Sequence, residues 1–142
     1  MIRKATQNDL QFVYNLYTHP QVNPHLLYEN MDLEQFIPIY QDLLDDAVKY
    51  IFEENDSPVG MFKLIHLKHR SSHIAYIGGL AIHPDFGGKG FGGKMMQEIM
   101  DLAKEMGIQR IELSVGSENL QAPKLYKKWV LKRREFFGNI RI

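Results

Sequence analysis

Apolar residues recur along this chain with two different periods, and each period predicts one kind of element. In the first third they recur every three to four residues, the spacing of one face of an α-helix. Thr6 or Asn8 can cap the first such helix, and Asp32 can cap the second. Pro38 lies inside the second pattern and is expected to break or bend that helix. The predicted apolar faces hold Leu10, Val13, Leu16 and Tyr17 in the first helix, and Phe36, Ile39, Tyr40, Leu43 and Leu44 in the second.

Alternation of apolar and polar residues replaces the helical period in the middle of the chain and predicts β-strands. A short strand at 1–5 precedes the first helix. Paired glycines, Gly78 and Gly79, interrupt the last of three later runs, which indicates a bulge or the close approach of another group. These three strand-like runs lie at 49–54, 61–69 and 72–84, and residues 55–60 (NDSPVG) are expected to form the turn between the first two.

The last third of the chain returns to helix and strand in turn. A strongly amphipathic helix is predicted at 92–107, with Gly107 as its C-terminal cap. A strand, a short helix and two strand-like runs follow at 110–115, 121–129, 131–137 and 140–142. The predicted order, βααβββαβαβ, is that of a mixed α/β chain, and we expect residues 1–142 to form one domain.

Composition narrows the class of protein. The 142 residues are 44% hydrophobic and 24% charged, which is typical of a globular chain. Lys and Arg balance Asp and Glu at 17 each, so charge gives no support for nucleic acid or an anionic membrane as the main partner. The absence of cysteine excludes thiol nucleophiles and cysteine-ligated metals. Without a signal-like segment or a run of about 18 apolar residues, we expect a cytoplasmic protein.

Residues 86–95 (FGGKGFGGKM) carry five glycines and two lysines at the start of the amphipathic helix. Gly88, Gly90 and Gly93 fit the dinucleotide pattern G-x-G-x-x-G, and Gly88, Gly93 and Lys94 fit most of the P-loop pattern. The same glycines suit a loop that holds the pyrophosphate of an acyl carrier such as coenzyme A. A plain turn is the remaining interpretation, but so many glycines before a helix favour backbone N–H groups that converge on an anion.

Two of these interpretations conflict with their surroundings. A P-loop needs a Ser or Thr hydroxyl after the lysine to hold magnesium, and Met95 stands there. The dinucleotide fingerprint opens the first βαβ unit of a doubly wound sheet, whereas this loop follows a run of antiparallel strands. Glu112 lies about 20 residues further on, but inside the next predicted strand and not at its end, where the ribose would be.

The segment 78–96 (GGLAIHPDFGGKGFGGKMM) resembles the central motif of the GNAT superfamily of acetyl-CoA-dependent N-acetyltransferases, a strand followed by a glycine-rich loop and a helix. Residues 80–84 match the end of the strand and residues 87–92 match the loop. A second segment, 118–129, resembles the family phrase N-x-x-A-x-x-L-Y-x-K at Asn119, Ala122, Leu125, Tyr126 and Lys128. Both motifs occur in the family's order, and so do the predicted elements, so the resemblance covers essentially the whole chain.

The resemblance implies a mixed, largely antiparallel GNAT-type sheet flanked by helices, with acetyl-CoA as co-substrate and no metal. Tyr126 would protonate the departing thiolate and Asn119 would hydrogen-bond the cofactor, although a packed aromatic and a helix cap remain the alternatives. Backbone groups of the central strand would hold the pantetheine arm, and amides of the loop the pyrophosphate. The implied cofactor-binding residues are Leu80, Ala81, Ile82, Gly87, Gly88, Lys89, Gly90, Phe91, Gly92, Gly93 and Asn119.

Direct attack by an amine also requires a group that removes a proton, because amines are mostly protonated at neutral pH. His73, Tyr76 and Glu112 are the candidates on the predicted strands, and Glu29 lies between the first two helices. GNAT members often use a Glu or a water chain here. The central strand of this chain has no acidic residue, so the identity of the base stays open.

Several positions depart from the family pattern. Gly87 replaces the usual Gln or Arg, and Val130-Leu131 replaces Gly-Phe. The C-terminal hairpin is expected to be truncated, with residues 138–142 repacked or the sheet edge covered by a second chain in a homodimer.

The expected acceptor is a primary amine of a small molecule, such as an amino acid, or a peptide N-terminus. Residues 18–31, where the family selects its acceptor, lack the acidic cluster that polycations would need. The alternative is a catalytically impaired member that binds acyl-CoA or a partner protein without turnover.

Overall fold

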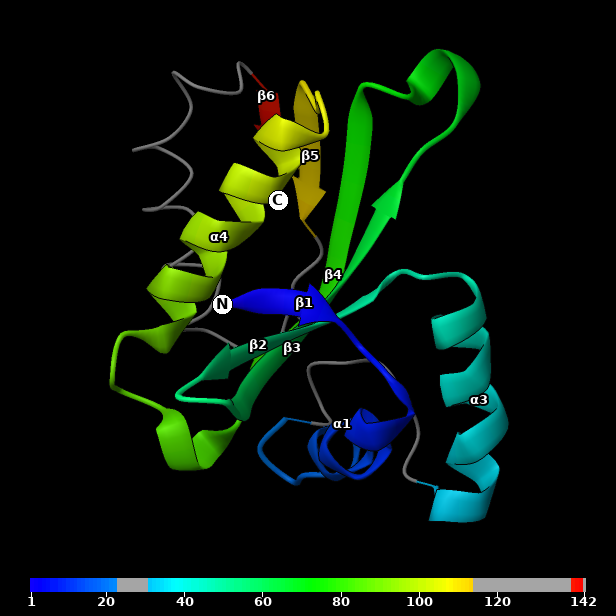
Figure 1. The fold of residues 1–142 in the computed structure, drawn as a ribbon, viewed down its shortest axis with the longest axis vertical. Coiled ribbons are helices and arrows are strands. Elements are labelled where there is room, and N and C mark those ends of the chain that lie inside the picture. Colours follow the sequence, from blue (N-terminus) through cyan, green and yellow to red (C-terminus); the bar gives the residue numbers. More distant parts are fainter. Residues whose placement is uncertain (23–30, 114–138, 142) are drawn as a thin grey trace.

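The computed structural model describes residues 1–22, 31–113 and 139–141, and in this part of the chain six strands form one sheet (Figure 1). The strands lie in chain order: β1 (Ile2–Lys4), β2 (Lys49–Glu54), β3 (Ser57–His66), β4 (Ile74–Ile82), β5 (Arg110–Leu113) and β6 (Asn139–Arg141). The pairs from β1 to β4 are antiparallel, whereas β4–β5 and β5–β6 are parallel. The expected mixed and largely antiparallel sheet is confirmed.

Helix α4 (Phe91–Glu105) covers one side of the sheet, which we call the α4 face (Figure 1). Gly107 ends the helix with a φ of 74°, and the N–H groups of Gly107 and Ile108 donate to the carbonyls of Lys104 and Ala103. These two bonds form a Schellman motif, so the predicted cap at Gly107 is confirmed. The side chains that α4 buries against the strands are Met95, Met96, Ile99, Met100 and Ala103.

Helices α1 (Leu10–Tyr17) and α3 (Leu33–Asp45) cover part of the opposite side, which we call the α1/α3 face. Thr6 caps a 3₁₀ turn (Gln7–Asp9) that leads into α1, and its N–H donates to the Asp9 carboxylate at 2.8 Å. The Asp32 carboxylate accepts from the Gln35 N–H at 2.8 Å and caps α3. The cap predicted at Asp32 is therefore confirmed, whereas the N-cap of α1 is Asp9 and neither Thr6 nor Asn8.

The break expected at Pro38 does not occur, because α3 runs through it from Leu33 to Asp45. Proline removes the bond that its N–H would make to the carbonyl four residues earlier, here that of Glu34. Glu34 and Pro38 are both exposed, so water can satisfy that carbonyl. Phe36 and Tyr40, on the opposite side of the same helix, are fully buried and hold the helix against the sheet.

The turn expected at 55–60 is shorter than predicted. Only Asn55 and Asp56 lie outside the strands, with φ angles of 53° and 63°, the left-handed region that Asn and Asp tolerate best. β3 begins at Ser57 and includes Pro58, opposite an irregularity between Phe52 and Glu53. Proline is accepted in a strand at such irregular positions, and this is why composition alone misplaced the start of β3.

The bulge expected at the paired glycines is confirmed in the pairing of β3 with β4. Met61 faces Ala81 but Lys63 faces Gly78, so β4 holds one more residue than β3 across this stretch. Gly79 has a φ of 58°, a conformation that favours glycine. We call Gly78 and Gly79 the glycine bulge.

The terminal segment lies at the edge of the sheet. Asn139, Ile140 and Arg141 pair with Arg110, Ile111 and Glu112 of β5 in parallel register. This arrangement corresponds to the repacking that was one of the two expectations for residues 138–142. The predicted elements at 121–129 and 131–137 lie outside the described residues.

Candidate active site

The glycine-rich loop connects β4 to α4 through a 3₁₀ turn, Pro84–Phe86. Gly88 and Gly90 have φ angles of 74° and 80°, so the backbone turns twice where a side chain would be strained. A Cβ atom added to Gly88, Gly90 or Gly93 would have no heavy atom within 4 Å. One side of the loop is therefore open, and a bound group can approach the backbone there.

The N-terminus of α4 supplies hydrogen-bond donors to this open side. The first intrahelical bond runs from the Lys94 N–H to the Gly90 carbonyl at 3.2 Å, so the N–H groups of the preceding residues have no acceptor inside the helix. The helix dipole favours negative charge at the same end. Lys89 and Lys94 are exposed beside it, and Lys94 is 3.4 Å from Glu54. Converging amides, a helix N-terminus and two lysines fit a pyrophosphate.

Gly87 differs from the other glycines of the loop. Its φ of −66° and ψ of 152° are open to any residue, so the backbone does not require glycine there. A Cβ atom at this position would lie 3.3 Å from the Pro84 carbonyl oxygen, which is a tight contact. The loop thus forms without the long polar side chain that the family pattern led us to expect.

Two side chains reach the glycine bulge from the α1/α3 face. The ring of Tyr76 lies along β4, with its hydroxyl 3.1 Å from the position that a Cβ atom of Gly78 would take. Nζ of Lys49 lies 3.5 Å from the corresponding position at Gly79. The strand lacks side chains at both points, and this is what allows an amine and a phenol to approach its backbone.

Lys49 is the most unusual of these groups because its side chain is 1% exposed. Nζ donates to the Tyr17 hydroxyl at 2.9 Å and lies 4.8 Å from the centre of that ring. Burial, with a smaller contribution from the charge of Lys63, lowers the pKa of Lys49 to about 7. Burial raises the pKa of Tyr17 to about 12. Near neutral pH a large fraction of Lys49 is therefore an uncharged amine.

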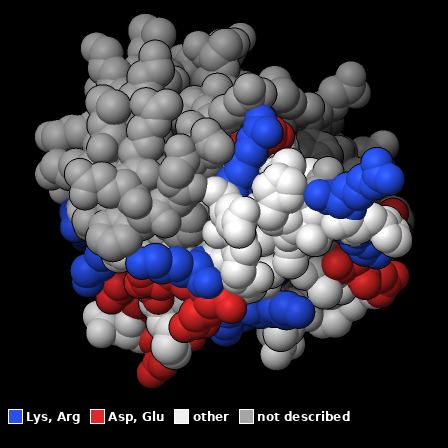
Figure 2. All heavy atoms as spheres, turned by 90° about the horizontal axis from the view of Figure 1, so that it is seen from above, with Lys and Arg blue, Asp and Glu red and all other residues white. Residues whose placement is uncertain are grey.

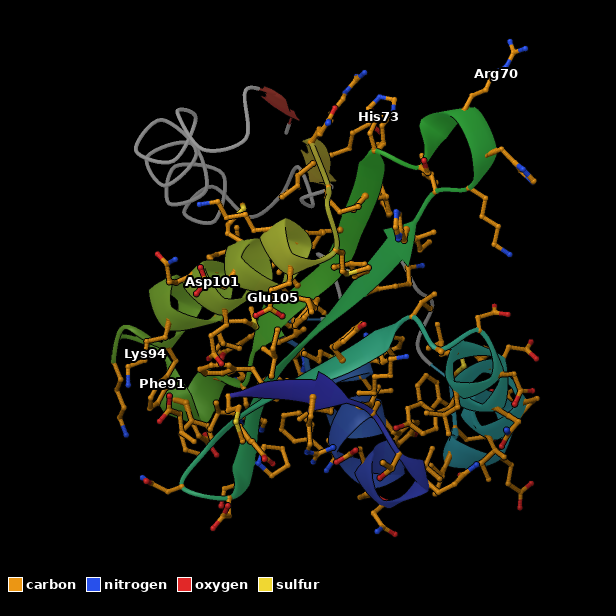
Figure 3. The ribbon with its side chains drawn as sticks, turned by 45° about the horizontal axis from the view of Figure 1, so that its top comes forward. Arg70, His73, Phe91, Lys94, Asp101 and Glu105 are labelled. Carbon is orange, nitrogen blue, oxygen red and sulfur yellow. The ribbon has the colours of Figure 1, made fainter. Side chains whose placement is uncertain are left out.

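The structure does not bring the three proposed bases on the strands together. Tyr76 and Glu112 lie opposite each other on β4 and β5, and Glu112 is 3.0 Å from Arg110. His73 is exposed just before β4 begins, at the end remote from Phe91 and Lys94 (Figure 3). It precedes Gly78 by five residues, roughly 17 Å of extended chain.

The remaining predicted site residues divide into two groups. Leu80 and Ile82 are half-buried, and both pack against the α4 core, while Ala81 packs against the α1/α3 core. Asn119, Tyr126 and Glu29 lie outside the described residues. Their predicted roles therefore stay predictions.

Lys49 is the residue that sequence reasoning missed, although a signal was present. In the strand KYIFEE, residues 50 and 52 are aromatic and residue 51 is aliphatic, so both faces of the strand are apolar. A strand of that kind is buried on both sides. Lys49 shares a face with Ile51, and that position alone would have indicated a buried lysine.

Charges of both signs are mixed on the surface. Figure 2 shows Lys and Arg spheres beside Asp and Glu spheres over the described part of the face seen from above. Within the described ranges, no helix is long and apolar enough to cross a membrane. The same ranges contain no group of three His, Asp or Glu side chains that could hold a metal ion.

Comparison with known proteins agrees with this geometry. A curated protein, an uncharacterized N-acetyltransferase of Methanocaldococcus jannaschii, is 30% identical over 96 residues. The match covers 64% of this chain and 42% of that relative, so the chain spans less than half of the relative's length.

Solved structures share the fold at low sequence identity. A spermidine N-acetyltransferase from Vibrio cholerae, in complex with CoA and spermine, superposes with a TM-score of 0.77 at 21% identity, over 91% of this chain and 78% of that one. An N-acetyltransferase from Staphylococcus aureus Mu50 gives 0.71 at 19% identity, over 91% and 81%. A ribosomal-protein-alanine N-acetyltransferase from Brucella melitensis gives 0.69 at 17%, over 90% and 82%. The model of the GNAT acetyltransferase family matches residues 10–130, and the chain belongs to that family.

Proposed function

We propose that residues 1–142 form one N-acetyltransferase domain that moves the acetyl group of acetyl-CoA to a primary amine of a small molecule. The observation that carries this proposal is a run of three consecutive features in the chain: a strand with a bulge, a loop and a helix N-terminus. The glycine bulge of β4 is followed by the open glycine loop, and the loop by the N-terminus of α4. Family membership supports the same reaction.

Two kinds of group in this chain are proposed to bind acetyl-CoA: backbone N–H groups at the glycines and the charged side chains beside them. The amides at the start of α4 and the open loop bind the pyrophosphate of acetyl-CoA, with Lys89 and Lys94 as additional positive charge. When bound, acetyl-CoA supplies the activated acetyl group. Backbone groups from Leu80 to Ile82 hold the pantetheine arm, and N–H groups at the glycine bulge stabilise the negative charge that develops on the acetyl oxygen.

Asn119 and Tyr126 complete the site by the phrase that they match. Asn119 hydrogen-bonds the cofactor, and Tyr126 donates a proton to the sulfur of the leaving thiolate. Neither residue acts through the loop amides. Substitution of Tyr126 should therefore lower turnover, and substitution of Asn119 should weaken cofactor binding.

The charges around the glycine bulge bear on the acceptor. Lys63 lies opposite Gly78 in the register. Arg110, on the neighbouring strand, is 3.0 Å from Glu112, so this pair adds no net charge. Residues that pair across strands share a face, so Lys63 and Gly78 both lie on the α1/α3 face. Positive charge there disfavours a polyamine and favours an acceptor that carries a carboxylate, such as an amino acid. Spermine, the ligand of the Vibrio cholerae structure, is therefore a useful comparison substrate.

The test is a thiol-release assay with acetyl-CoA and a panel of amines. We expect release of CoA with at least one free amino acid or another monoamine, and slower release with spermine. Tyr126→Phe should lower turnover roughly 100-fold, the lower end of general acid catalysis, with acetyl-CoA binding intact by calorimetry.

Two other results would change the conclusion. Tight binding of acetyl-CoA without turnover on any amine would favour a catalytically impaired member that only binds the cofactor. Gly87, which replaces the Gln or Arg of the family pattern, is one departure consistent with such impairment. No binding of acetyl-CoA at all would overturn both.

A further inference from the structure

We propose that Lys49 is the group that accepts the proton lost by the acceptor amine during acetyl transfer. The inference rests on the proposed N-acetyltransferase function and names its missing base. It assigns a role to a buried side chain of β2, at the opposite end of that strand from Glu54, which pairs with Lys94.

Position is the first argument. Nζ of Lys49 lies 3.5 Å from where a Cβ atom of Gly79 would be, so the amine lies directly beside the backbone of the glycine bulge. The acetyl carbonyl is proposed to be held at that same bulge. Of the groups considered as bases, His73 lies roughly 17 Å away along the strand. Glu112 lies opposite Tyr76, two residues before the bulge, and is paired with Arg110.

The surroundings of Lys49 are the second argument. The Tyr17 hydroxyl of α1 accepts from Nζ, and the charge of Lys63 on β3 acts on it. Tyr76 of β4 lies beside the neighbouring glycine, Gly78. Among the described residues, Lys49 has no carboxylate in an ion pair. A buried ammonium without a counter-charge is strongly disfavoured, so this amine loses its proton far more readily than a surface lysine.

Chemistry is the third argument. A general base works best when its pKa lies near the operating pH, and the pKa of Lys49 is about 7. A neutral amine has a lone pair that can accept a proton, and the Tyr17 hydroxyl can donate to that lone pair or accept from the ammonium. A purely structural side chain at this place would be better replaced by an apolar one of the same length, such as methionine.

Acetyl transfer forms one bond to the acetyl carbon and breaks another. The acceptor nitrogen forms a bond to the acetyl carbon, and the bond from that carbon to the CoA sulfur breaks. The proton of the nitrogen moves to Nζ of Lys49, which becomes an ammonium. The sulfur leaves as a thiolate and takes up one proton, for which Tyr126 is the proposed donor. Lys49 then releases its proton to water before the next turnover.

The experiment compares Lys49→Met and Lys49→Arg with the wild type, using the amine that the panel identifies. Lys68→Met serves as the matched control, because Lys68 is exposed and lies beyond the end of β3, five residues after Lys63, which faces Gly78. We expect Lys49→Met to lower kcat/KM by at least 100-fold while calorimetry shows unchanged acetyl-CoA binding. Arginine stays protonated and cannot accept a proton, so Lys49→Arg should be equally impaired although it keeps a cation there.

The pH profile supplies a readout that a structural role would not move. Wild-type kcat/KM should fall as the pH drops through about 7, and this limb should vanish from the residual activity of Lys49→Met. The limb caused by the acceptor amine itself remains in both proteins. In parallel, a ¹³C NMR titration of Cε-labelled lysine should show one resonance, absent from Lys49→Met, with a midpoint near 7.

Each outcome decides between the proposals. Wild-type turnover with normal kcat/KM in Lys49→Met, rescue by Lys49→Arg, or a Lys49 midpoint near the ordinary value of 10.5 would overturn the inference alone. Absence of wild-type turnover with every amine would overturn the proposed function, and the role of Lys49 with it.

Discussion

The two faces of the sheet are built from the same strands but differ in what they bury. On the α4 face the described core contains no buried charged side chain and runs from Phe52 of β2 to Ile111 of β5, with the phenol of Tyr50 at its margin. On the α1/α3 face the aliphatic residues share their space with buried polar groups. Asp9 is 4% exposed and held by Arg3, and Lys49 is 1% exposed and bonded to Tyr17.

This difference separates stability from chemistry. A uniform apolar core contributes in proportion to the area that it removes from water, and it offers no group that could react. A buried ionisable group costs stability, but its pKa then responds to its surroundings. The proposed chemistry therefore lies on the α1/α3 face, where polar groups are buried. Much of the packing of the sheet comes from α4 on the other face.

The largest expected effect lies on the α4 face. Ile99→Ala removes a fully buried side chain, and we expect the free energy of unfolding to fall by about 2–5 kcal/mol. Urea denaturation measures this loss. At a temperature where the variant is still folded, its kcat should equal that of the wild type. A lower kcat in the folded variant would break the separation between the two faces.

A smaller effect, with a defined pH dependence, is expected at Lys49. The folded pKa of about 7 lies below the ordinary 10.5, so between these values the unfolded chain binds more protons and wild-type stability rises with pH. The cost of burying the ammonium is fully present below pH 7. Lys49→Met lacks this cost, and its stability advantage over the wild type should narrow by roughly 2 kcal/mol between pH 7 and pH 9.

Urea titrations of the two proteins across that range provide the measurement. Lys68→Met, at an exposed lysine, should run parallel to the wild type. If the curves of the wild type and Lys49→Met also ran parallel, the amine would keep the same protonation in the folded and unfolded chains. The contrast between the faces would then be one of packing alone.

The smallest effect concerns the loop that follows β4. Gly93 lies in the first turn of α4 with no heavy atom near its Cβ position, so Gly93→Ala should raise stability by about 0.5–1 kcal/mol through helix propensity. If the open side of the loop holds the pyrophosphate, the added methyl group should weaken acetyl-CoA binding at the same time. Thermal unfolding and calorimetry separate these effects, and unchanged affinity would place the pyrophosphate elsewhere.

Much of this fold could be predicted because its signals are local. The period of apolar residues located α4 and the strands, and Asp32 and Gly107 marked helix ends by their own chemistry. Of the break or bend expected at Pro38, the break was wrong, because the buried residues on the other side of the helix outweigh one lost hydrogen bond.

Local sequence patterns predicted only part of the candidate site. The glycine-rich loop can be recognised from the sequence, because its proposed function depends on the absence of side chains at consecutive positions. Lys49 was overlooked because its proximity to Gly79 spans 30 residues and depends on how β2, β3 and β4 lie side by side. Such a contact is a property of the sheet, and no local period reveals it.

The extra residue in β4 makes the length of that strand a constraint in its own right. Ala75 and Ile77 lie in the α4 core, and strict alternation would send Leu80 and Ile82 to the opposite side. They pack against the α4 core because one added residue inverts the alternation between Ile77 and Leu80. A substitution in this strand alters single contacts. The loss of one residue before Leu80 would instead turn the side chains of Leu80 and Ile82 to the α1/α3 face and shift the start of the glycine loop.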